Sequence, residues 1–488
     1  MKLIPTLEEI QSIRQSGQYD LVPVRTEILA DFLTPIQALK KLKTISAHVF
    51  MLESAIPDQE WGRYTFLGFD PKLEITCKNG QFACGSLELE SEDPSERVRS
   101  ILSHYRAPAL EGFPPFCGGL AGYFSFDYFG YAEPTSRVLE PDFTSMNDLD
   151  LMLFDKVIVF DHFRQKILLI ANVELSHVEE SYEKARLELE QMKAVLLSGK
   201  EKREKAGRLL EELQPRLSKP EYCSMVEKAK EHIHAGDIFQ IVLANSLVAP
   251  FEGSLLNTYR QLRTLNPSPY MFYFSGEDME TAGASPETLV RLEKGKLTTF
   301  PLAGTRPRGK SPEEDRDLEA ELLQDEKELA EHNMLVDLGR NDLGRVSRLG
   351  SVHVDSLHDI LRYSHVMHIG STVSGTLRED ADALDAVEAV LPAGTLSGAP
   401  KIRAVQLIGE LEGRHRGLYG GALGYISFSG DMDICIAIRL AVLRQGQVQV
   451  SSGAGIVADS VPEKEYQECL NKAQAVVSAL KAAEEMES

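Results

Sequence analysis

Short hydrophobic runs alternate with polar turn residues over the first third of the chain. Between residues 47 and 170, apolar segments such as 49–52, 64–68 and 157–160 are separated by Gly, Pro, Asp and Asn. Short aromatic and β-branched runs bounded by turn residues are typical of strands. The pattern therefore predicts an antiparallel sheet with few helices in this part of the chain.

The pattern changes between residues 176 and 220, where Glu, Lys, Leu and Ala predominate and Ser198-Gly199-Lys200 interrupts them. This composition predicts two charged helices at a boundary between lobes, and the apolar repeat is not sustained enough for a coiled coil. A second lobe begins near Lys219 with a helix that ends at Gly236. Strand-like runs follow at 238–243, 270–274 and 288–292.

Strands with hairpin-like spacing outnumber helices, so we expect an α+β fold rather than a doubly wound parallel sheet. The expected architecture is a two-lobed, β-sandwich-like core of antiparallel sheets surrounded by helices. A chain of 488 residues is long for one ordinary core, which favours two domains or one large two-lobed unit. The expected lobes are 1–215, which includes a helical linker, and 216–488, and their sheets are free to intermix.

Two predicted helices of the second lobe carry acidic residues away from their apolar faces. The first begins after Ser311 as one long helix, and Glu331 lies off its apolar stripe. The second begins at Pro462, and Glu465 and Glu468 lie off its apolar face. The simplest interpretation is two solvated faces, with Glu468 paired to the lysine four residues later, a contact worth about 0.3–0.5 kcal/mol.

The residues before the last helix favour a functional interpretation. Apolar runs at 437–442 and 448–450 end in the turn Gly453-Ala454-Gly455, and the helix at Pro462 follows directly. We therefore expect backbone amides, Arg439 and the carboxylates of the last helix to meet at one place.

Composition limits the classes of function. The net charge of −22, without a basic stripe, argues against a nucleic-acid binder but not against a small anionic substrate. The six cysteines show no CxxC spacing, which indicates reduced thiols. No run of about 18 apolar residues and no apolar signal core are present, so we expect a cytoplasmic protein without a membrane association.

Three further motifs have alternative explanations. The charged segment 338–346 is also compatible with a structural ion-pair corner. His368, in a strand-like run, would more often be a core or rim residue than a catalyst. The Gly/Thr/Ser/Pro run at 391–401 lacks the GxxxxGK[ST] spacing of a phosphate-binding loop, so its glycines need another explanation.

Taken together, the motifs of the second lobe closely resemble those of the chorismate-utilising enzymes. The matching runs are 301–306, 331–342, 393–401 and 453–455 with Glu468, in the family's order. The resemblance implies that Glu331 and Glu468 bind Mg²⁺, which prefers oxygen ligands, against the ring carboxylate of chorismate. Other positions implied to bind chorismate are Gly304, Thr305, Tyr419, Arg439, Gly453, Ala454 and Gly455.

The resemblance also implies catalytic roles. In the anthranilate-forming branch of the family, ammonia adds at ring C2, the C4 hydroxyl leaves, and pyruvate is then eliminated. Glu287 occupies the position of the acid that protonates the departing hydroxyl, and His368 the position tied to the elimination. Thr395 and Gln240 are the remaining catalytic positions that we predict.

The residues at two positions distinguish the branches of the family. Aminodeoxychorismate synthases typically carry a nucleophilic lysine where this chain has Ala303. Isochorismate and salicylate synthases use a lysine base where it has Gln240. With neither amine present, the anthranilate-forming branch is favoured over these alternatives. Because no glutaminase motif is visible, we expect a separate glutamine amidotransferase subunit to supply ammonia within a hetero-oligomer.

The first lobe resembles the family's regulatory region, which binds tryptophan as a feedback inhibitor. The matching residues are Leu52, Glu53, Ser54, Pro269, Tyr270, Met271 and Cys435. Without the family, the same residues would be an ordinary strand end and a loop shaped by prolines. Two alternatives from other classes are a non-catalytic tryptophan-sensing partner and a binding module with an acidic surface. Retention of all five of Glu287, Glu331, His368, Arg439 and Glu468 argues against a decayed site.

Overall fold

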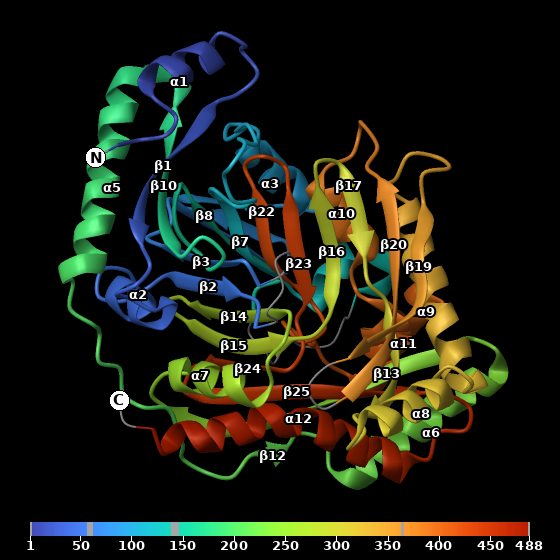
Figure 1. The fold of residues 1–488 in the computed structure, drawn as a ribbon. Coiled ribbons are helices and arrows are strands. Elements are labelled where there is room, and N and C mark those ends of the chain that lie inside the picture. Colours follow the sequence, from blue (N-terminus) through green and yellow to red (C-terminus); the bar gives the residue numbers. More distant parts are fainter. Residues whose placement is uncertain (1, 56–61, 138–145, 363–365, 487–488) are drawn as a thin grey trace.

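The computed structural model describes residues 2–55, 62–137, 146–362 and 366–486, and its core is two large antiparallel sheets (Figure 1). In this part of the chain the first sheet has 13 strands and the second has 12. The first sheet runs in the order β1 (Leu21–Leu29), β10 (Lys166–Glu174), β9 (Lys156–Asp161), β3 (Tyr64–Phe69), β2 (Val49–Glu53), β14 (Tyr270–Ser275), β15 (Met279–Ser285), β24 (Leu440–Arg444), β25 (Gln447–Ile456), β13 (Gln240–Glu252) and β11 (Arg208–Leu209), and β12 (Gln214–Pro215) and β21 (Gly398–Ala399) also pair with β13.

The second sheet runs in the order β18 (Leu302–Pro307), β20 (Val366–Thr376), β17 (Lys296–Thr299), β16 (Thr288–Glu293), β23 (Met432–Ile436), β22 (Ala422–Ser427), β7 (Gly119–Phe124), β8 (Leu149–Phe154), β4 (Leu73–Lys78), β5 (Gln81–Cys84) and β6 (Leu87–Glu90), and β19 (His353–Arg362) pairs with β20. The α-helices are α1 (Leu7–Arg14), α2 (Pro35–Leu42), α3 (Pro94–Leu102), α4 (Phe129–Ala132), α5 (Val178–Ser198), α6 (Lys219–Ala235), α7 (Leu256–Leu265), α8 (Pro312–Leu322), α9 (Glu326–Gly344), α10 (Ala383–Val390), α11 (Lys401–Glu412) and α12 (Pro462–Glu484). The predicted α+β fold with antiparallel sheets is confirmed.

Strands from both halves of the chain share each sheet. β2 pairs with β14 in the first sheet, with Leu52 opposite Phe272, and β7 pairs with β22 in the second, with Tyr123 opposite Leu423. A boundary at residue 215 therefore does not separate one sheet from the other. The assignment of a regulatory lobe to 1–215 and a catalytic lobe to 216–488 stays a prediction.

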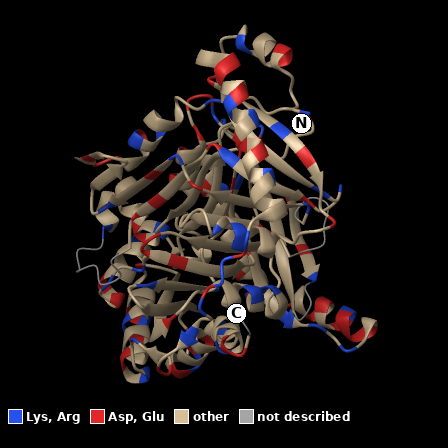
Figure 2. Cartoon of the chain, turned by 90° about the vertical axis from the view of Figure 1, so that its left-hand side faces the viewer, with Lys and Arg blue, Asp and Glu red and all other residues tan. Residues whose placement is uncertain are grey.

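The hydrophobic core has three main layers. Between the sheets, aromatic side chains interlock: the rings of Phe50 and Phe154 meet edge to face, with centroids 4.9 Å apart. Helices α2, α5, α7 and α12 cover the outer face of the first sheet, and α3, α9 and α10 cover that of the second. Acidic and basic residues are intermingled along the outer helices, whereas the strands carry few charges (Figure 2).

The prediction of two charged helices between residues 176 and 220 is wrong. Helix α5 ends at Ser198, and residues 200–217 instead contain the short strands β11 and β12, which pair with β13. The backbone amide of Leu209 donates a hydrogen bond to the Glu484 carboxylate at 2.6 Å. The sequence favoured a helix locally, but these distant partners satisfy the backbone in an extended form.

The single long helix predicted after Ser311 is two helices. α8 ends at Leu322, and Asp325 then begins α9, since its side chain accepts hydrogen bonds from the amides of Lys327 and Glu328 at 3.1 and 3.2 Å. Aspartate is a favoured N-cap because its carboxylate satisfies amides that a helix start leaves unpaired. Within the described ranges, no helix combines the length and apolar character needed to cross a membrane.

Candidate active site

The short 3₁₀ turn η4 (Gly394–Leu396) lies at the centre of the candidate site, where it packs against α9, β13 and β25. The glycines around it are required by close contacts. A Cβ on Gly394 would lie 2.1 Å from a methyl carbon of Leu338, and one on Gly398 would lie 2.2 Å from the Gln240 carbonyl oxygen. Tight packing of backbone on neighbouring elements therefore explains the Gly/Thr/Ser/Pro run.

Glu287 and Thr395 form the first predicted pair. Glu287 lies between β15 and β16, where its carbonyl accepts a hydrogen bond from the Ile436 amide at 3.0 Å. Thr395 Oγ1 donates to Glu287 Oε1 at 3.2 Å. Burial raises the pKa of Glu287 to about 8, and Thr395 and the charge of Arg439 only partly oppose it. At neutral pH this carboxyl group is protonated, as a general acid requires.

His368 forms the second group with Gly304 and Thr305. β18 and β20 place Thr305 opposite His368, and Nδ1 of His368 lies 3.0 Å from both the Gly304 carbonyl and Thr305 Oγ1. A carbonyl can only accept a hydrogen bond, so Nδ1 carries the proton and Nε2 is left as an acceptor. Burial lowers the pKa of His368, the Gly304 carbonyl opposes this, and Arg439 lowers it further. His368 is therefore a neutral imidazole suited to accept a proton.

Arg439 connects these two groups, because its charge acts on both Glu287 and His368. It lies between β23 and β24 with a positive φ of 51°, a conformation that costs a residue with a side chain about 1 kcal/mol. Its carbonyl accepts a hydrogen bond from the Ala284 amide at 3.1 Å, which helps to fix this backbone. A strained arginine whose charge reaches both an acid and a base is a candidate binder of a substrate carboxylate.

The turn predicted at Gly453-Ala454-Gly455 is wrong: these residues belong to strand β25, where they pair with β13 and lie beside Tyr419 and Gln240. A Cβ on Gly453 would lie 3.0 Å from the hydroxyl oxygen of Tyr419, and one on Gly455 would lie 2.9 Å from Gln240 Nε2. Gly453 is required, because a Cβ there would also lie 2.9 Å from the Leu243 carbonyl oxygen, whereas at Gly455 the Gln240 side chain could move aside. Ala454, between them, is fully buried in the core that β13 and β25 share with α6 and α11.

Two buried cations that sequence analysis did not assign hold η4 and the helices beside it. Arg416 donates to the carbonyls of Leu396 and Val242, both at 2.7 Å, and pairs with Glu412 on α11. The only sequence signal for this contact is the spacing of four residues between Glu412 and Arg416. Lys401 has a similar function, since its Nζ lies 2.8 Å from the Asp342 carboxylate and 2.9 Å from the Val390 carbonyl.

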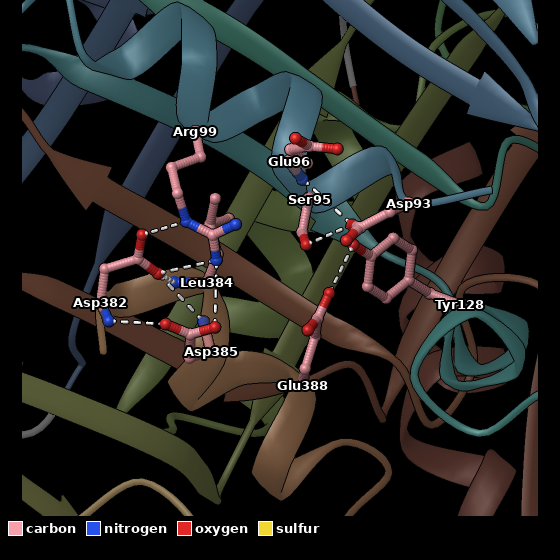
Figure 3. Close-up of polar contacts among 9 residues, drawn as sticks. All are labelled: Asp93, Ser95, Glu96, Arg99, Tyr128, Asp382, Leu384, Asp385 and Glu388. Atoms are coloured by element: carbon pink, nitrogen blue, oxygen red, sulfur yellow. Dashed lines mark hydrogen bonds and ion pairs between the residues drawn. The ribbon is translucent and has the colours of Figure 1, made fainter. Parts of the chain in front are cut away.

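Helix α10, which leads into η4, is fixed to the N-terminal half of the chain (Figure 3). Arg99 of α3 forms ion pairs with Asp382 at 2.6 Å and Asp385 at 3.0 Å. The Tyr128 hydroxyl donates to Glu388 at 3.1 Å. These contacts join the acidic face of α10 to α3 and the segment after β7, so both halves of the chain position Thr395.

The two predicted metal ligands are not in direct contact. Glu331 accepts a long hydrogen bond of 3.5 Å from Gln240 Nε2. Glu468 pairs with Lys472 at 2.8 Å and is half exposed, which is the simple alternative predicted for it. In the part of the chain that the structure describes, no three His, Cys, Asp or Glu side chains are grouped closely enough to hold a metal ion.

Neighbouring carboxylates nevertheless repel each other within each of the two helices α9 and α12. Burial raises the pKa of Glu328, and so does the charge of Glu331. Burial likewise raises the pKa of Glu465, and so does the charge of Glu468. The charge of Lys327 acts on both Glu328 and Glu465, which shows that the starts of the two helices lie near each other. Carboxylate oxygens are the ligands that Mg²⁺ prefers, so the donor type at the starts of these helices fits this cation.

All seven residues predicted to bind tryptophan line one cavity of about 80 Å³, which we call the inter-sheet cavity. Its walls come from β2, β3 and β14 of the first sheet and from β16, β22 and β23 of the second. Phe66, Phe272 and Tyr425 supply aromatic surface, while Arg291 and Asp433 supply charge of both signs. Residues far apart in the sequence thus meet at one place, as the resemblance implied.

Comparison with known proteins agrees with this geometry. Residues 48–478 match the family described as chorismate binding enzyme. The chain is 43% identical to anthranilate synthase component 1 of Acetivibrio thermocellus and 44% identical to that of Aquifex aeolicus, in each case over 99% of both proteins. Anthranilate synthase component I from Streptococcus pneumoniae has a similar structure, with a TM-score of 0.75 and 37% identity over 92% of this chain and 98% of that one.

Proposed function

The chain belongs to the family of chorismate binding enzymes, and from that premise we propose that it converts chorismate and ammonia to anthranilate and pyruvate, the first committed step of tryptophan biosynthesis. The observation that carries the proposal is that Arg439 acts electrostatically on both the buried Glu287, which Thr395 contacts at 3.2 Å, and His368, whose Nδ1 is bound to the Gly304 carbonyl. The near full-length similarity to anthranilate synthase component 1 from two organisms supports the same branch of the family.

The two steps use these groups in turn. Ammonia adds at ring C2, the double bonds shift, and the C4–O bond breaks as Glu287 gives its proton to the departing hydroxyl, which leaves as water. The C3–O bond then breaks, enolpyruvate leaves and takes up a proton to become pyruvate, and C2 loses its proton to complete the aromatic ring. His368 Nε2 is the acceptor for that proton because Nδ1 is occupied by the Gly304 carbonyl.

Binding of the dianionic substrate is assigned to the surrounding groups. Arg439 and Tyr419 hold the enolpyruvyl carboxylate, with backbone N–H groups of β25 between Gly453 and Gly455. Gly304, Thr305 and Thr395 line the ring. Thr305 is exposed and Thr395 is only partly buried, so a substrate can reach both side chains from solvent.

Mg²⁺ is assigned to Glu331 and Glu468, with Glu328 and Glu465 close to them. When bound, it would neutralise the ring carboxylate of chorismate. Mg²⁺ in substrate sites typically uses one or two carboxylates and completes its shell with water and substrate, so a three-ligand protein cluster is not required. In electron paramagnetic resonance titrations, Mn²⁺ should bind more tightly with chorismate present, and Glu331→Gln should remove that gain. Equal Mn²⁺ binding by both proteins would refute the ligand assignment.

A separate glutamine amidotransferase subunit is the proposed source of ammonia in a hetero-oligomer. Ala303 and Gln240 stand where other branches carry lysines, which favours ammonia from outside the chain. The purified chain should therefore use ammonium but not glutamine. Glutamine-dependent turnover by the chain alone would contradict the proposal of a separate amidotransferase subunit.

The proposed location is the cytoplasm, with which the six unpaired cysteines are compatible.

Tryptophan is the proposed feedback inhibitor, bound in the inter-sheet cavity. Aromatic walls suit an indole, and the acidic and basic side chains suit the ammonium and carboxylate of a free amino acid. A volume of about 80 Å³ is too small for the whole molecule. Binding would therefore separate the sheets locally, and a movement of that kind is a physical basis for inhibition.

The experiment that tests the function is a product assay with chorismate, ammonium and Mg²⁺, followed by anthranilate fluorescence, with and without EDTA and tryptophan. We expect fluorescence that EDTA abolishes and tryptophan suppresses. Formation of isochorismate or aminodeoxychorismate instead would place the chain in another branch, and no turnover at all would favour a sensing module.

A further inference from the structure

The inter-sheet cavity and the candidate active site share a wall. Glu287 and Thr395 line a small cavity of about 40 Å³, which we call the Glu287 cavity, and Thr288 and Ile436 line it as well. Thr288 of β16 pairs with Cys435 of β23, and Cys435 lines the inter-sheet cavity on the other side. The residues next to the catalytic acid therefore separate the two cavities.

A row of hydrogen bonds crosses this wall. The Tyr270 hydroxyl, which lines the inter-sheet cavity, lies 2.7 Å from Asp433 Oδ1 and 2.9 Å from Thr288 Oγ1. A carboxylate only accepts, and a phenol has one hydrogen, so Tyr270 donates to Asp433 and Thr288 donates to Tyr270. Tyr270 and Asp433 face the inter-sheet cavity, while Thr288 faces the Glu287 cavity.

The backbone around Thr288 is able to pass a displacement to Glu287. The register between β16 and β23 shifts between Thr288 and Val290, a bulge at which the ladder is locally interrupted. Glu287 is adjacent, and its amide donates to Ser285 Oγ at 3.3 Å. The contact of Glu287 with Thr395, at 3.2 Å, is already long for two oxygens, so a small movement would break it.

We propose that Tyr270 is a positioning residue for the catalytic acid: its hydroxyl holds Thr288, and thereby Glu287 against Thr395, and tryptophan inhibits by drawing this hydroxyl away. The inference rests on the proposed function and names the contact through which the inhibitor acts. The ring of Tyr270 would thus contact the inhibitor in the inter-sheet cavity, while its hydroxyl contacts Thr288 beside Glu287.

The test is Tyr270→Phe, which removes the hydroxyl and keeps the ring. Without tryptophan, kcat should fall severalfold while KM for chorismate stays within about twofold, and the alkaline limb of the pH profile should move upward as the Thr395 contact weakens. Calorimetry should show tryptophan still binding within about threefold of the original Kd. The factor by which saturating tryptophan lowers kcat should fall at least about fivefold in the variant, because the contact through which tryptophan acts is already missing.

Tyr273→Phe is a matched control. Tyr273 lies three residues further along the same strand and is fully buried, and its hydroxyl donates a hydrogen bond to the Glu280 carboxylate. The Tyr273→Phe variant should be less stable but should keep the full reduction of kcat by saturating tryptophan. Should Tyr270→Phe fold poorly, Thr288→Val breaks the same row of hydrogen bonds and should weaken the effect of tryptophan on kcat in the same way.

Full inhibition of Tyr270→Phe with an unchanged pH profile would overturn the inference. So would loss of tryptophan binding with unchanged kcat and pH profile, since Tyr270 would then be only a ligand contact. Failure of the proposed function is a different result: the unaltered chain would form no anthranilate, or would not bind tryptophan.

Discussion

The hydrogen bond from Thr395 to Glu287 makes a quantitative prediction for the pH dependence of the reaction. Thr395 stabilises the ionised form of Glu287, whose pKa burial raises to about 8. The Thr395→Val variant removes the donor and keeps the shape of the side chain. Because the ionised form then loses a partner, the pKa of Glu287 should rise. The protonated acid should persist to higher pH, and the alkaline limb of kcat/KM should move in the same direction.

The size of the shift follows from the geometry. A hydrogen bond to a charged group contributes about 1.5–3 kcal/mol, and the 3.2 Å separation of the two oxygens favours the lower end. At about 1.4 kcal/mol per pKa unit, the limb should move from about pH 8 to about pH 9. At pH 8.5 the protonated fraction would be roughly threefold larger in the variant than in the unaltered protein.

The assay is the initial rate of anthranilate fluorescence at low chorismate, between pH 6 and 10, with total ammonium adjusted so that free NH₃ stays constant. Absolute activity should fall, since Thr395 also lines the ring, so the position of the limb is the quantity compared. Thr395→Ser keeps the donor and should keep the limb of the unaltered protein. An unmoved or lowered limb in Thr395→Val would refute the assignment of Glu287 as the acid.

Three further predictions test neighbouring parts of the site. The pKa of Glu287 in the folded protein lies above its unfolded value, so this residue lowers the free energy of unfolding increasingly as pH rises from about 4.5 to about 8. Glu287→Gln should therefore raise Tm more at pH 8.5 than at pH 5. A gain in Tm that is independent of pH would contradict the burial argument. His368→Met should form the aminated intermediate but release little pyruvate, as chromatography of quenched reactions would show; normal anthranilate turnover would exclude His368 from the elimination. Ser54→Phe fills the inter-sheet cavity and should raise the tryptophan concentration needed for half inhibition at least about tenfold without changing KM for chorismate, whereas unchanged inhibition would move the inhibitor elsewhere.

Local patterns were sufficient to predict much of the fold. Apolar runs bounded by turn residues located strands such as β2, β3 and β9 within a residue or two of their observed ends. Gly236 marked the end of α6, where it adopts a positive φ of 84°. The errors arose where tertiary partners decided the outcome. The segment after Gly199 has helical composition, yet β13 and Glu484 hold it extended, and Asp325 begins a new helix within an apolar pattern that looked continuous.

In the candidate site, too, some residues were predictable from the sequence and others depended on tertiary contacts. The roles of Glu287, His368 and Arg439 were implied by the resemblance of the motifs to the family, and they stay predictions. Periodicity could not predict that Arg416 binds the carbonyl of Leu396, since that contact depends on how α11 packs against β13. Nor could it predict that Tyr270 joins the inter-sheet cavity to Thr288, because strand pairing across the whole chain creates that contact.

The central claim is that this site adds ammonia to chorismate and then eliminates pyruvate. The most direct measurement is mass spectrometry of the products after incubation with chorismate, Mg²⁺ and ¹⁵N-ammonium, with pyruvate quantified in the same sample. The account predicts ¹⁵N-labelled anthranilate and pyruvate in equal amounts for each chorismate consumed. A product without ¹⁵N, or labelled product that retains the enolpyruvyl group, would contradict it.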